Sequence, residues 1–258
     1  MSLESKMATL KHLLYTWMTA LPRIAYRSTL SLTLDPRGAQ KFLHQVLSAQ
    51  DLEADDPFLG SAWITDLLPG AAEPKIMGPY HLHRSSDTRI FLELVALAYL
   101  MQVLRPRVVF EIGTFVGRTT RLLALNCPHD SQIFTLDLPR DQATHDIGVD
   151  FRNTPEAAKI TQLHGDSRTF DYSSWRSRCD FIWVDACHDY PFVVHDTMAA
   201  LKLHSEGGWI AWHDYRHTAW WSGVTRAVRE LAQGHPGIRH IRGTTIAVLP
   251  PKTLALTN

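Results

Sequence analysis

Apolar positions from Ser86 onward fall into short runs separated by helix-length segments. The runs are apolar at nearly every position, which is typical of strands buried on both faces of a parallel sheet. The expected strands are Val108 to Ile112, Gln132 to Leu136, Ile160 to Leu163, Phe181 to Val184 and Trp209 to Trp212. Their regular alternation with helical segments predicts consecutive βαβ units.

The segments between these runs carry helical patterns. The expected helices are Arg118 to Asn126, a short one near Pro155 to Ala158, another near Phe170 to Trp175, Phe192 to Leu203, and one from about Trp220 to Gln233. Upstream, the 15-residue apolar run from Ile90 to Leu104 is interrupted by Glu93 and Gln102. Because a bilayer-spanning helix needs roughly 20 apolar residues, this run predicts a buried helix.

The end of the chain changes the pattern. The runs Gly237 to Ile241 and Thr245 to Leu249 are separated by three residues only. Such a connection is too short for a parallel crossover, so the two runs are expected to pair antiparallel. The fold class is therefore α/β: a Rossmann-like doubly wound sheet, mostly parallel, with a C-terminal antiparallel strand pair.

The first 85 residues differ from the rest. Helical patterns near Leu3 to Ala20 and Arg37 to Ala49 precede a stretch broken by prolines and glycines. We expect a helical extension with an irregular connector over residues 1–85 and the main domain over residues 86–258. The extension has two open roles, a cover over the acceptor site or a contact in a homo-oligomer.

Composition narrows the class of partner. With 45% hydrophobic and 20% charged residues, the chain has the material for a core and lacks the signature of disorder. Its 26 Lys and Arg residues balance its 26 Asp and Glu residues, with no block of like charge. The footprint of a nucleic-acid or anionic-membrane binder is therefore missing, and a small-molecule partner is expected.

The cysteines and the N-terminus indicate a compartment. Cys127, Cys179 and Cys187 form neither a fully paired disulfide framework nor a zinc-ligand spacing. No secretory signal pattern is recognisable at the N-terminus. A reducing, cytoplasmic setting is the expectation.

The first candidate binding element is the segment Glu111-Ile112-Gly113-Thr114-Phe115-Val116-Gly117, where a strand ends and a helix begins. Glycine lets a backbone turn tightly and approach a ligand closely. The spacing of Gly113 and Gly117 departs from the GxGxxG of nicotinamide-binding sites. A purely structural turn remains an alternative.

Two further acids follow the next two strands. Asp137 lies 24 residues after Gly113, where a carboxylate can accept both hydroxyls of a ribose. Asp166, flanked by Gly165 and Ser167, follows the third strand and would lie beside the ribose, near an adenine. Each acid has a structural alternative, a turn or helix cap for Asp137 and an N-cap for Asp166. Open α/β sheets bind ligands at the carboxyl edge, where all these residues would lie.

A second cluster follows the fourth and fifth strands, in Asp185-Ala186-Cys187-His188-Asp189-Tyr190 and in His213-Asp214-Tyr215. On neighbouring strands Asp185 and Asp214 would converge, and two close carboxylates favour a proton or cation between them. Their oxygens suit Mg²⁺, Mn²⁺ or Ca²⁺. His188 can face the same pocket and take a proton from a substrate hydroxyl, or it can simply bind the following turn. In an ideal strand His213 points away from Asp214, so joint metal ligation requires a bend.

Cys187 and the segment Pro139 to Thr154 lie beside the candidate site residues in the sequence. Cys187 fits a small buried residue better than a nucleophile. The segment Pro139 to Thr154 is too long for a tight connection, and it is either a lid or acceptor-specificity loop, or an ordered surface insertion.

These motifs in this order resemble the class I S-adenosylmethionine (SAM)-dependent methyltransferases. The match is closest to methyltransferase family 24, a small-molecule O-methyltransferase group that includes macrolide-sugar O-methyltransferases and cephalosporin-hydroxylase-like proteins. The resemblance spans roughly residues 107–248 and rests on EIGTFVGRTT, TPEAAKITQLHGDS, DACHDY and GGWIAWHDY. It implies a seven-stranded sheet and SAM-dependent methylation of a hydroxyl group, with or without a divalent metal.

The resemblance also implies roles for particular residues. Glu111, Gly113 and Gly117 would hold the methionine end of SAM, Asp137 the ribose, and Asp166 with Ser167 the adenine. Thr114 and Asp185 would also bind the cofactor. In metal-dependent relatives, positions matching Asp185 and an acidic pair after the fifth strand bind Mg²⁺, and a histidine matching His188 is the base. Here that pair is His213-Asp214, and an imidazole ligand would favour a transition metal over Mg²⁺. Metal-free catalysis by His188 remains an alternative.

Two other functions remain open. A strand-end acid after a glycine turn also serves NAD, so a nicotinamide-dependent oxidoreductase is one alternative, with the missing GxGxxG against it. A catalytically silent SAM-binding accessory protein is the other, because His213 departs from the expected carboxylate. The acceptor, whether sugar, phenol, polyketide or lipid-linked glycan, is not determined by the fold.

Overall fold

The computed structural model describes residues 54–76, 88–216 and 222–251. In chain order its elements are β1 (Ser61–Ala62), α3 (Ile64–Leu67), α4 (Thr88–Leu104), β2 (Val108–Ile112), α5 (Arg118–Asn126), β3 (Gln132–Asp137), η1 (Pro155–Lys159), β4 (Ile160–His164), η2 (Ser173–Trp175), β5 (Cys179–Val184), α6 (Tyr190–Leu203), β6 (His204–Trp212), α7 (Ser222–Ala232), β7 (Arg239–Ile241) and β8 (Ala247–Leu249). No helix within these ranges is long and apolar enough to cross a bilayer.

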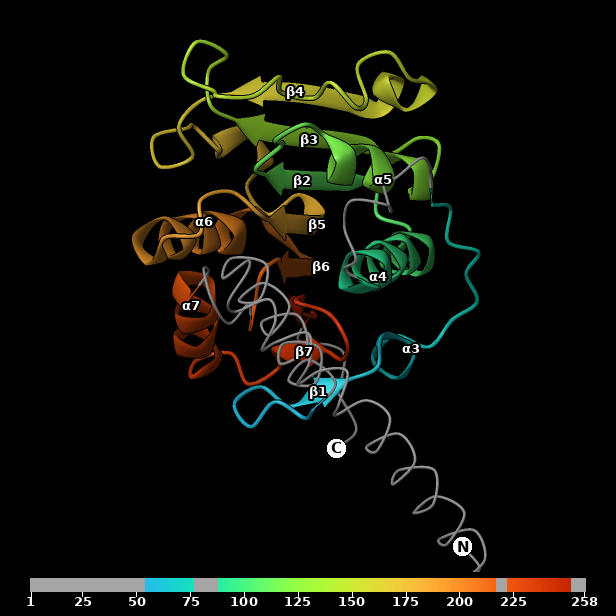
Figure 1. The fold of residues 1–258 in the computed structure, drawn as a ribbon, viewed down its shortest axis with the longest axis vertical. Helices are drawn as coiled ribbons and strands as arrows, with labels where there is room; N and C mark the ends of the chain where they lie inside the picture. The colour runs from blue at the N-terminus through green and yellow to red at the C-terminus, as the bar shows by residue number, and fades with distance from the viewer. Residues whose placement is uncertain (1–53, 77–87, 217–221, 252–258) are drawn as a thin grey trace, which may run out of the picture. The chain divides into compact units, whose positions relative to one another are not determined.

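The strands form one sheet in the order β1-β7-β8-β6-β5-β2-β3-β4, from bottom to top of Figure 1. The five strands β2 to β6 run parallel to one another. Strand β8 runs antiparallel to both β6 and β7, which confirms the expected C-terminal antiparallel pair. The α/β, doubly wound class is therefore confirmed.

The sheet extends to both sides of β2. Strands β3 and β4 extend the sheet on one side of β2, whereas β5 and β6 extend it on the other. The strand order therefore reverses between β2 and β5. Ligands of open α/β sheets bind at such a reversal, outside the carboxyl ends of the strands.

Alternate residues of the central strands supply two separate cores. One face, with Phe110, Ile182 and Ile210, packs with residues of α6 and α7. The other, with Val109 and Phe181, packs with residues of α4 and α5. Figure 1 shows the same division of the helices. This two-sided burial explains why the strands are apolar at nearly every position.

Most expected elements are confirmed, and a few are corrected. Helix α6 begins two residues before the expected start, because Pro191 is tolerated in a first helical turn. The short helices after β3 and β4 are 3₁₀ turns, and the second covers only Ser173–Trp175. The last expected helix is observed over Ser222–Ala232, and its first two positions, Trp220 and Trp221, lie outside the described residues.

The sheet has eight strands rather than seven. The additional strand β1 pairs in parallel with β7, with Ser61 opposite His240. Its two residues lie in the proline- and glycine-rich connector, where no run of strand-forming residues predicts a strand. Residues 54–76 therefore belong to the sheet domain, and the compact unit that contains them begins at Asp51 rather than at Ser86. The helices expected over Leu3 to Ala20 and Arg37 to Ala49 lie outside the described residues.

Candidate functional site

A cavity of about 510 Å³ lies at the reversal of the strand order. Its walls come from the ends of four strands: Ile112 and Gly113 after β2, Leu136 to Leu138 after β3, Gly165 to Ser167 after β4, and Asp185 to Cys187 after β5. Of the sequence-predicted cofactor residues, those lining the cavity are Gly113, Asp137, Asp166, Ser167 and Asp185. Glu111, Thr114 and Gly117 are not among the residues that line it.

Neighbouring protein atoms explain why positions 113 and 117 are glycines. A Cβ at Gly113, where φ is +104°, would lie 2.2 Å from the backbone oxygen of Asp185. A Cβ at Gly117, where φ is +85°, would lie 2.5 Å from the ring of Phe151. The first glycine thus lets the ends of β2 and β5 approach each other, and the second lets the loop after β3 pack beneath α5.

Glu111 is fully buried under the glycine turn. One of its carboxyl oxygens, Oε2, accepts hydrogen bonds from the hydroxyls of Thr120 and Thr135, the latter at 2.5 Å. Burial raises the pKa of Glu111 to about 8, assisted by the nearby charges of Asp185 and Asp137. Burial therefore favours the neutral form of Glu111, and its second oxygen, Oε1, has no hydrogen-bond partner among the described residues.

Asp137, the last residue of β3, stabilises the glycine turn through hydrogen bonds. Its Oδ2 accepts hydrogen bonds from the backbone N–H groups of Thr114 at 3.0 Å and Phe115 at 2.7 Å, and its Oδ1 accepts one from Leu138 at 2.7 Å. The side chain of Thr114 points away, to Thr135 and Gln162. Asp137 therefore fulfils the structural alternative, a turn-stabilising residue, while its carboxylate still lines the cavity.

Asp166 is held by the chain that follows it. The guanidinium of Arg168 contacts its carboxylate at 2.6 Å, and the backbone N–H of the same residue donates to Oδ1 at 2.9 Å. These bonds lower the pKa of Asp166 to about 2. Asp166 therefore closes a local turn and caps no regular helix, while Ser167 lies beside it in the cavity wall.

The loop Pro139 to Thr154 is anchored to the glycine turn. The backbone N–H groups of Gly148 and Asp150 donate to the carbonyls of Phe115 and Val116, at 3.0 and 2.9 Å. The ring of His145 lies against the ring of Phe115 at 4.5 Å between centroids, and both residues line the cavity. The loop is an ordered insertion that also contributes to the cavity wall.

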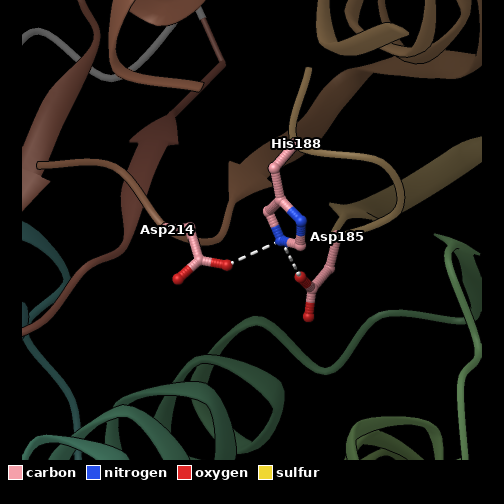
Figure 2. Close-up of side chains that lie close together, drawn as sticks. All are labelled: Asp185, His188 and Asp214. Atoms are coloured by element: carbon pink, nitrogen blue, oxygen red, sulfur yellow. Dashed lines mark ion pairs between the residues drawn. The ribbon is translucent and has the colours of Figure 1, made fainter. Parts of the chain in front are cut away.

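Asp185, His188 and Asp214 converge at the ends of β5 and β6. The Nε2 atom of His188 lies 2.8 Å from Asp214 Oδ2 and 3.8 Å from Asp185 Oδ1. Figure 2 shows the imidazole pointing between the two carboxylates. One ligand atom from each residue lies within 4.8 Å of the others, so the group has the dimensions of a metal site.

His213 joins this group because the chain bends after β6. Asp214 has a left-handed φ of +59°, which turns its carboxylate back toward the preceding residue. The Nδ1 atom of His213 consequently lies 3.2 Å from Asp185 Oδ1 and 3.2 Å from Asp214 Oδ2. The expected bend is therefore present, and four side chains share one centre.

Glu93 is a functional candidate that the sequence interpretation treated only as an interruption of an apolar run. It lies on α4, 7% exposed, and its Oε2 is 3.2 Å from Nε2 of His213. Its Oε1 accepts hydrogen bonds from the backbone N–H and the hydroxyl of Thr245, at 2.8 and 2.6 Å. The available signal was a charged residue within an otherwise apolar helix, since buried glutamates are rare without a partner.

The carboxylates and imidazoles of this cluster shift one another's protonation. Burial lowers the pKa of His188, but the hydrogen bonds to Asp185 and Asp214 outweigh it and raise the pKa to about 9. Burial likewise opposes the charged form of His213, but the two aspartates raise its pKa well above the usual value. Burial raises the pKa of Asp214 and of Asp185, and in both the His213 charge and the histidine hydrogen bonds bring it below its usual value. The cluster favours ionised carboxylates facing positive charge.

Cys187 differs from expectation. It is exposed rather than buried, and it lines the cavity beside Ala186. The residue follows the strand instead of ending it, so its side chain escapes the sheet's packing.

Comparison with known proteins agrees with this geometry. Residues 110–215 match a family model described as a methyltransferase domain, which covers β2 to β6 and the residues around the cavity. The curated Tapetum-specific methyltransferase 1 of Arabidopsis thaliana is 29% identical over 161 residues, which cover 61% of this chain and 64% of the relative. The chain thus spans less than two thirds of that relative's length.

Solved structures share the fold. The O-methyltransferase TomG from Streptomyces achromogenes, in complex with SAM, matches 68% of this chain and 92% of its own, with a TM-score of 0.50 and 20% identity. A structure described as a putative O-methyltransferase from Klebsiella pneumoniae matches 80% of this chain and 96% of its own, with a TM-score of 0.51 and 18% identity. These matches confirm the fold expected from the sequence motifs.

Proposed function

We propose that this protein, whose residues 110–215 match a family model described as a methyltransferase domain, is an enzyme of methyltransferase family 24. In this proposal it transfers the methyl group of SAM to a hydroxyl oxygen of a small molecule, such as a sugar or natural product. The observation that carries this proposal is Asp185. It belongs both to the wall of the cavity and to the His/Asp cluster, so one residue joins the cofactor site to the chemical site.

The cavity suits SAM in size and in the chemistry of its wall. Its volume of about 510 Å³ falls in the range of small-molecule and cofactor sites. In this proposal Asp137 accepts the ribose hydroxyls, and Asp166 with Ser167 contacts the adenine. Asp185 would contact the methionine part of the cofactor. Gly113 would allow the cofactor to approach the backbone closely, and Glu111 and Gly117 would support the glycine turn.

The chain's part in the reaction is alignment and proton removal. SAM supplies an electrophilic methyl group, so the protein must hold the acceptor oxygen in line and accept its proton. We assign proton acceptance to the imidazole of His188, which lies beside the two carboxylates. Because these carboxylates raise its pKa to about 9, the role requires a cation at the cluster, whose charge would lower that pKa. Asp185 and Asp214 would stabilise the resulting imidazolium, and such general-base action contributes about 10²- to 10⁴-fold.

The cluster also fits a divalent cation. Ligand atoms about 2.1 Å from a metal lie about 3 Å apart at neighbouring positions, close to the 3.2 Å separations of His213 Nδ1 from both carboxylates. Asp185, Asp214 and His213 would hold the ion, with His188 at hydrogen-bond distance from the same carboxylate. When bound, the ion would lower the pKa of an acceptor hydroxyl and oppose the protonation of His188.

Calorimetric titration with SAM and with its demethylated product tests the proposal, with and without Mg²⁺ or Mn²⁺. Micromolar binding of either, followed by methyl transfer to a hydroxylated acceptor, is the expected result. Binding without transfer to any acceptor would indicate an accessory protein, and binding of NAD alone would indicate an oxidoreductase.

A further inference from the structure

Glu93 contacts the Nε2 atom of His213, whereas Asp185 and Asp214 lie near the other ring nitrogen, Nδ1. The carboxylate of Glu93 is divided between two neighbours: Oε1 accepts two hydrogen bonds from Thr245, and Oε2 lies 3.2 Å from His213 Nε2. Because Oε1 is already fixed by two donors, the carboxylate cannot rotate freely. Oε2 is therefore aimed at the imidazole.

This contact would decide which nitrogen of His213 keeps its proton when a cation displaces the other. With Oε1 occupied by two donors, Oε2 of Glu93 is placed to accept a hydrogen bond from the Nε2–H group. Nδ1, at the other side of the ring, is then turned toward Asp185 and Asp214 at 3.2 Å from each. The ring also lies 5.5 Å from the indole of Trp183, which limits its rotation.

We propose that Glu93 is a positioning residue: it keeps a proton on Nε2 of His213 and so presents Nδ1, together with Asp185 and Asp214, as a ligand for a divalent transition-metal ion. The proposal deepens the proposed function and rests on it. Histidines that bind metals generally donate their second ring N–H to a carboxylate or carbonyl, and loss of that partner typically weakens metal binding about 10- to 100-fold.

The donor set indicates the class of ion. Carboxylate oxygens alone suit Mg²⁺, whereas one or two imidazole nitrogens beside two carboxylates suit Mn²⁺, Fe²⁺, Co²⁺ or Zn²⁺. A glutamate that holds the imidazole in its ligand tautomer strengthens that preference. We therefore expect Mn²⁺ to bind more tightly than Mg²⁺.

A competing explanation is that Glu93 merely ties α4 to the turn before β8 through Thr245. The two explanations differ in their expectation for Glu93→Gln. In that variant the amide oxygen accepts the hydrogen bond from the Thr245 N–H. The amide NH₂ group therefore faces His213, and Nε2 of His213 has to accept a hydrogen bond from it. The imidazole must then carry its proton on Nδ1, where it blocks metal ligation. A purely structural role predicts instead that Gln, which retains size and one acceptor, is milder than Ala.

The experiment is a titration of the full chain with Mn²⁺ alone. Calorimetry measures the affinity, and electron paramagnetic resonance measures the concentration of free Mn²⁺. We expect Glu93→Ala to weaken Mn²⁺ binding about 10- to 100-fold and Glu93→Gln to weaken it more. Thr245→Val, which removes one bond to Glu93 without touching the cluster, should weaken binding by a smaller factor. Binding of the demethylated cofactor, measured on the same samples, reports that the cavity is intact.

Three results would overturn the proposal: no Mn²⁺ binding by the unaltered protein, a Gln variant that binds Mn²⁺ as tightly as the unaltered protein or more tightly than the Ala variant, or unchanged Mn²⁺ binding in Thr245→Val. Failure of the proposed function has a different signature. In that case the unaltered protein binds no SAM or demethylated product, while the order of Mn²⁺ affinities among the variants can still be read.

Discussion

Gly113 lies against the backbone of Asp185, so closely that a Cβ at position 113 would be 2.2 Å from the carbonyl oxygen. The same two segments are joined by a hydrogen bond from the Asp185 N–H to the carbonyl of Ile112, at 2.9 Å. The reversal point of the sheet, where the cavity forms, therefore depends on the absence of one methyl group.

Gly113→Ala should destabilise the protein strongly. Positive φ at a non-glycine residue costs about 1–3 kcal/mol and overpacking against fixed backbone costs a similar amount, so we expect a loss of about 2–6 kcal/mol in the free energy of unfolding. Denaturant unfolding measures it. Gly207→Ala is the control, because a Cβ there meets no atom within 4 Å. Equal effects of the two variants would contradict the argument.

Asp137→Ala should weaken binding of the demethylated cofactor at least tenfold. The change removes the carboxylate from the cavity wall and also releases the backbone N–H groups of Thr114 and Phe115 that it orients. Calorimetry gives the affinity. The control is Asp141→Ala, which removes the same charge from an exposed position outside the cavity lining. Equal affinities for the two variants would exclude Asp137 from the cofactor site.

His188→Gln should reduce turnover by about 10²- to 10⁴-fold, the usual contribution of a general base. Cofactor affinity should stay near that of the unaltered protein, because His188 does not line the cavity. Steady-state kinetics with a hydroxylated acceptor, paired with calorimetry, separates the two effects. His195→Gln, on the neighbouring helix α6, is the matched change away from the cluster. Undiminished turnover in His188→Gln would remove His188 from its assigned role.

His240 should make stability depend on pH. It is fully buried, with Nδ1 2.9 Å from the hydroxyl of Ser61 and Nε2 2.7 Å from the carbonyl of Thr244. Burial lowers its pKa to about 4, below the value of 6.5 in an unfolded chain. The unfolded state therefore binds a proton first as the pH falls, so the stabilisation is complete above about pH 6.5 and is lost progressively down to about pH 4.

The expected loss is about 3 kcal/mol, from a shift of about two and a half pKa units at 1.36 kcal/mol each. Denaturant unfolding between pH 7 and 4 measures it in the unaltered protein and in His240→Gln, whose pH slope should be shallower. His129→Gln, at an exposed position, should leave the slope unchanged. An identical slope in all three proteins would contradict the assignment.

The central strands could be predicted from the sequence because their burial leaves a local signature. Val108–Ile112 is apolar except for Glu111, and the helix Arg118–Asn126 follows a glycine turn, so both were placed with their observed bounds. Strand β1 leaves no such signature. Its two residues pair through backbone atoms with a strand about 180 positions later, and backbone pairing imposes little on side-chain type.

The site divides in the same way. Asp137, Asp166 and Asp185 follow apolar strands, so their common edge could be inferred from topology alone. Glu93 reaches His213 across 120 positions of sequence, and no spacing rule connects a helix residue to a strand end so far away. The bend at Asp214 depends on a backbone conformation that an aspartate tolerates but does not require.

Strand β1 also determines where the folded unit can be cut. It occupies the outer position next to β7, and its Ser61 supplies a hydrogen bond to the buried His240. A fragment that starts at Ser86 would lack β1 and would leave the backbone of β7 unpaired at the edge of the sheet. Such an edge can pair with strands from other chains. A fragment that starts at Asp51 retains β1, so the backbone of β7 stays paired. The short connector thus replaces a longer exposed edge at β7 with a strand of only two residues, which offers another chain little to pair with.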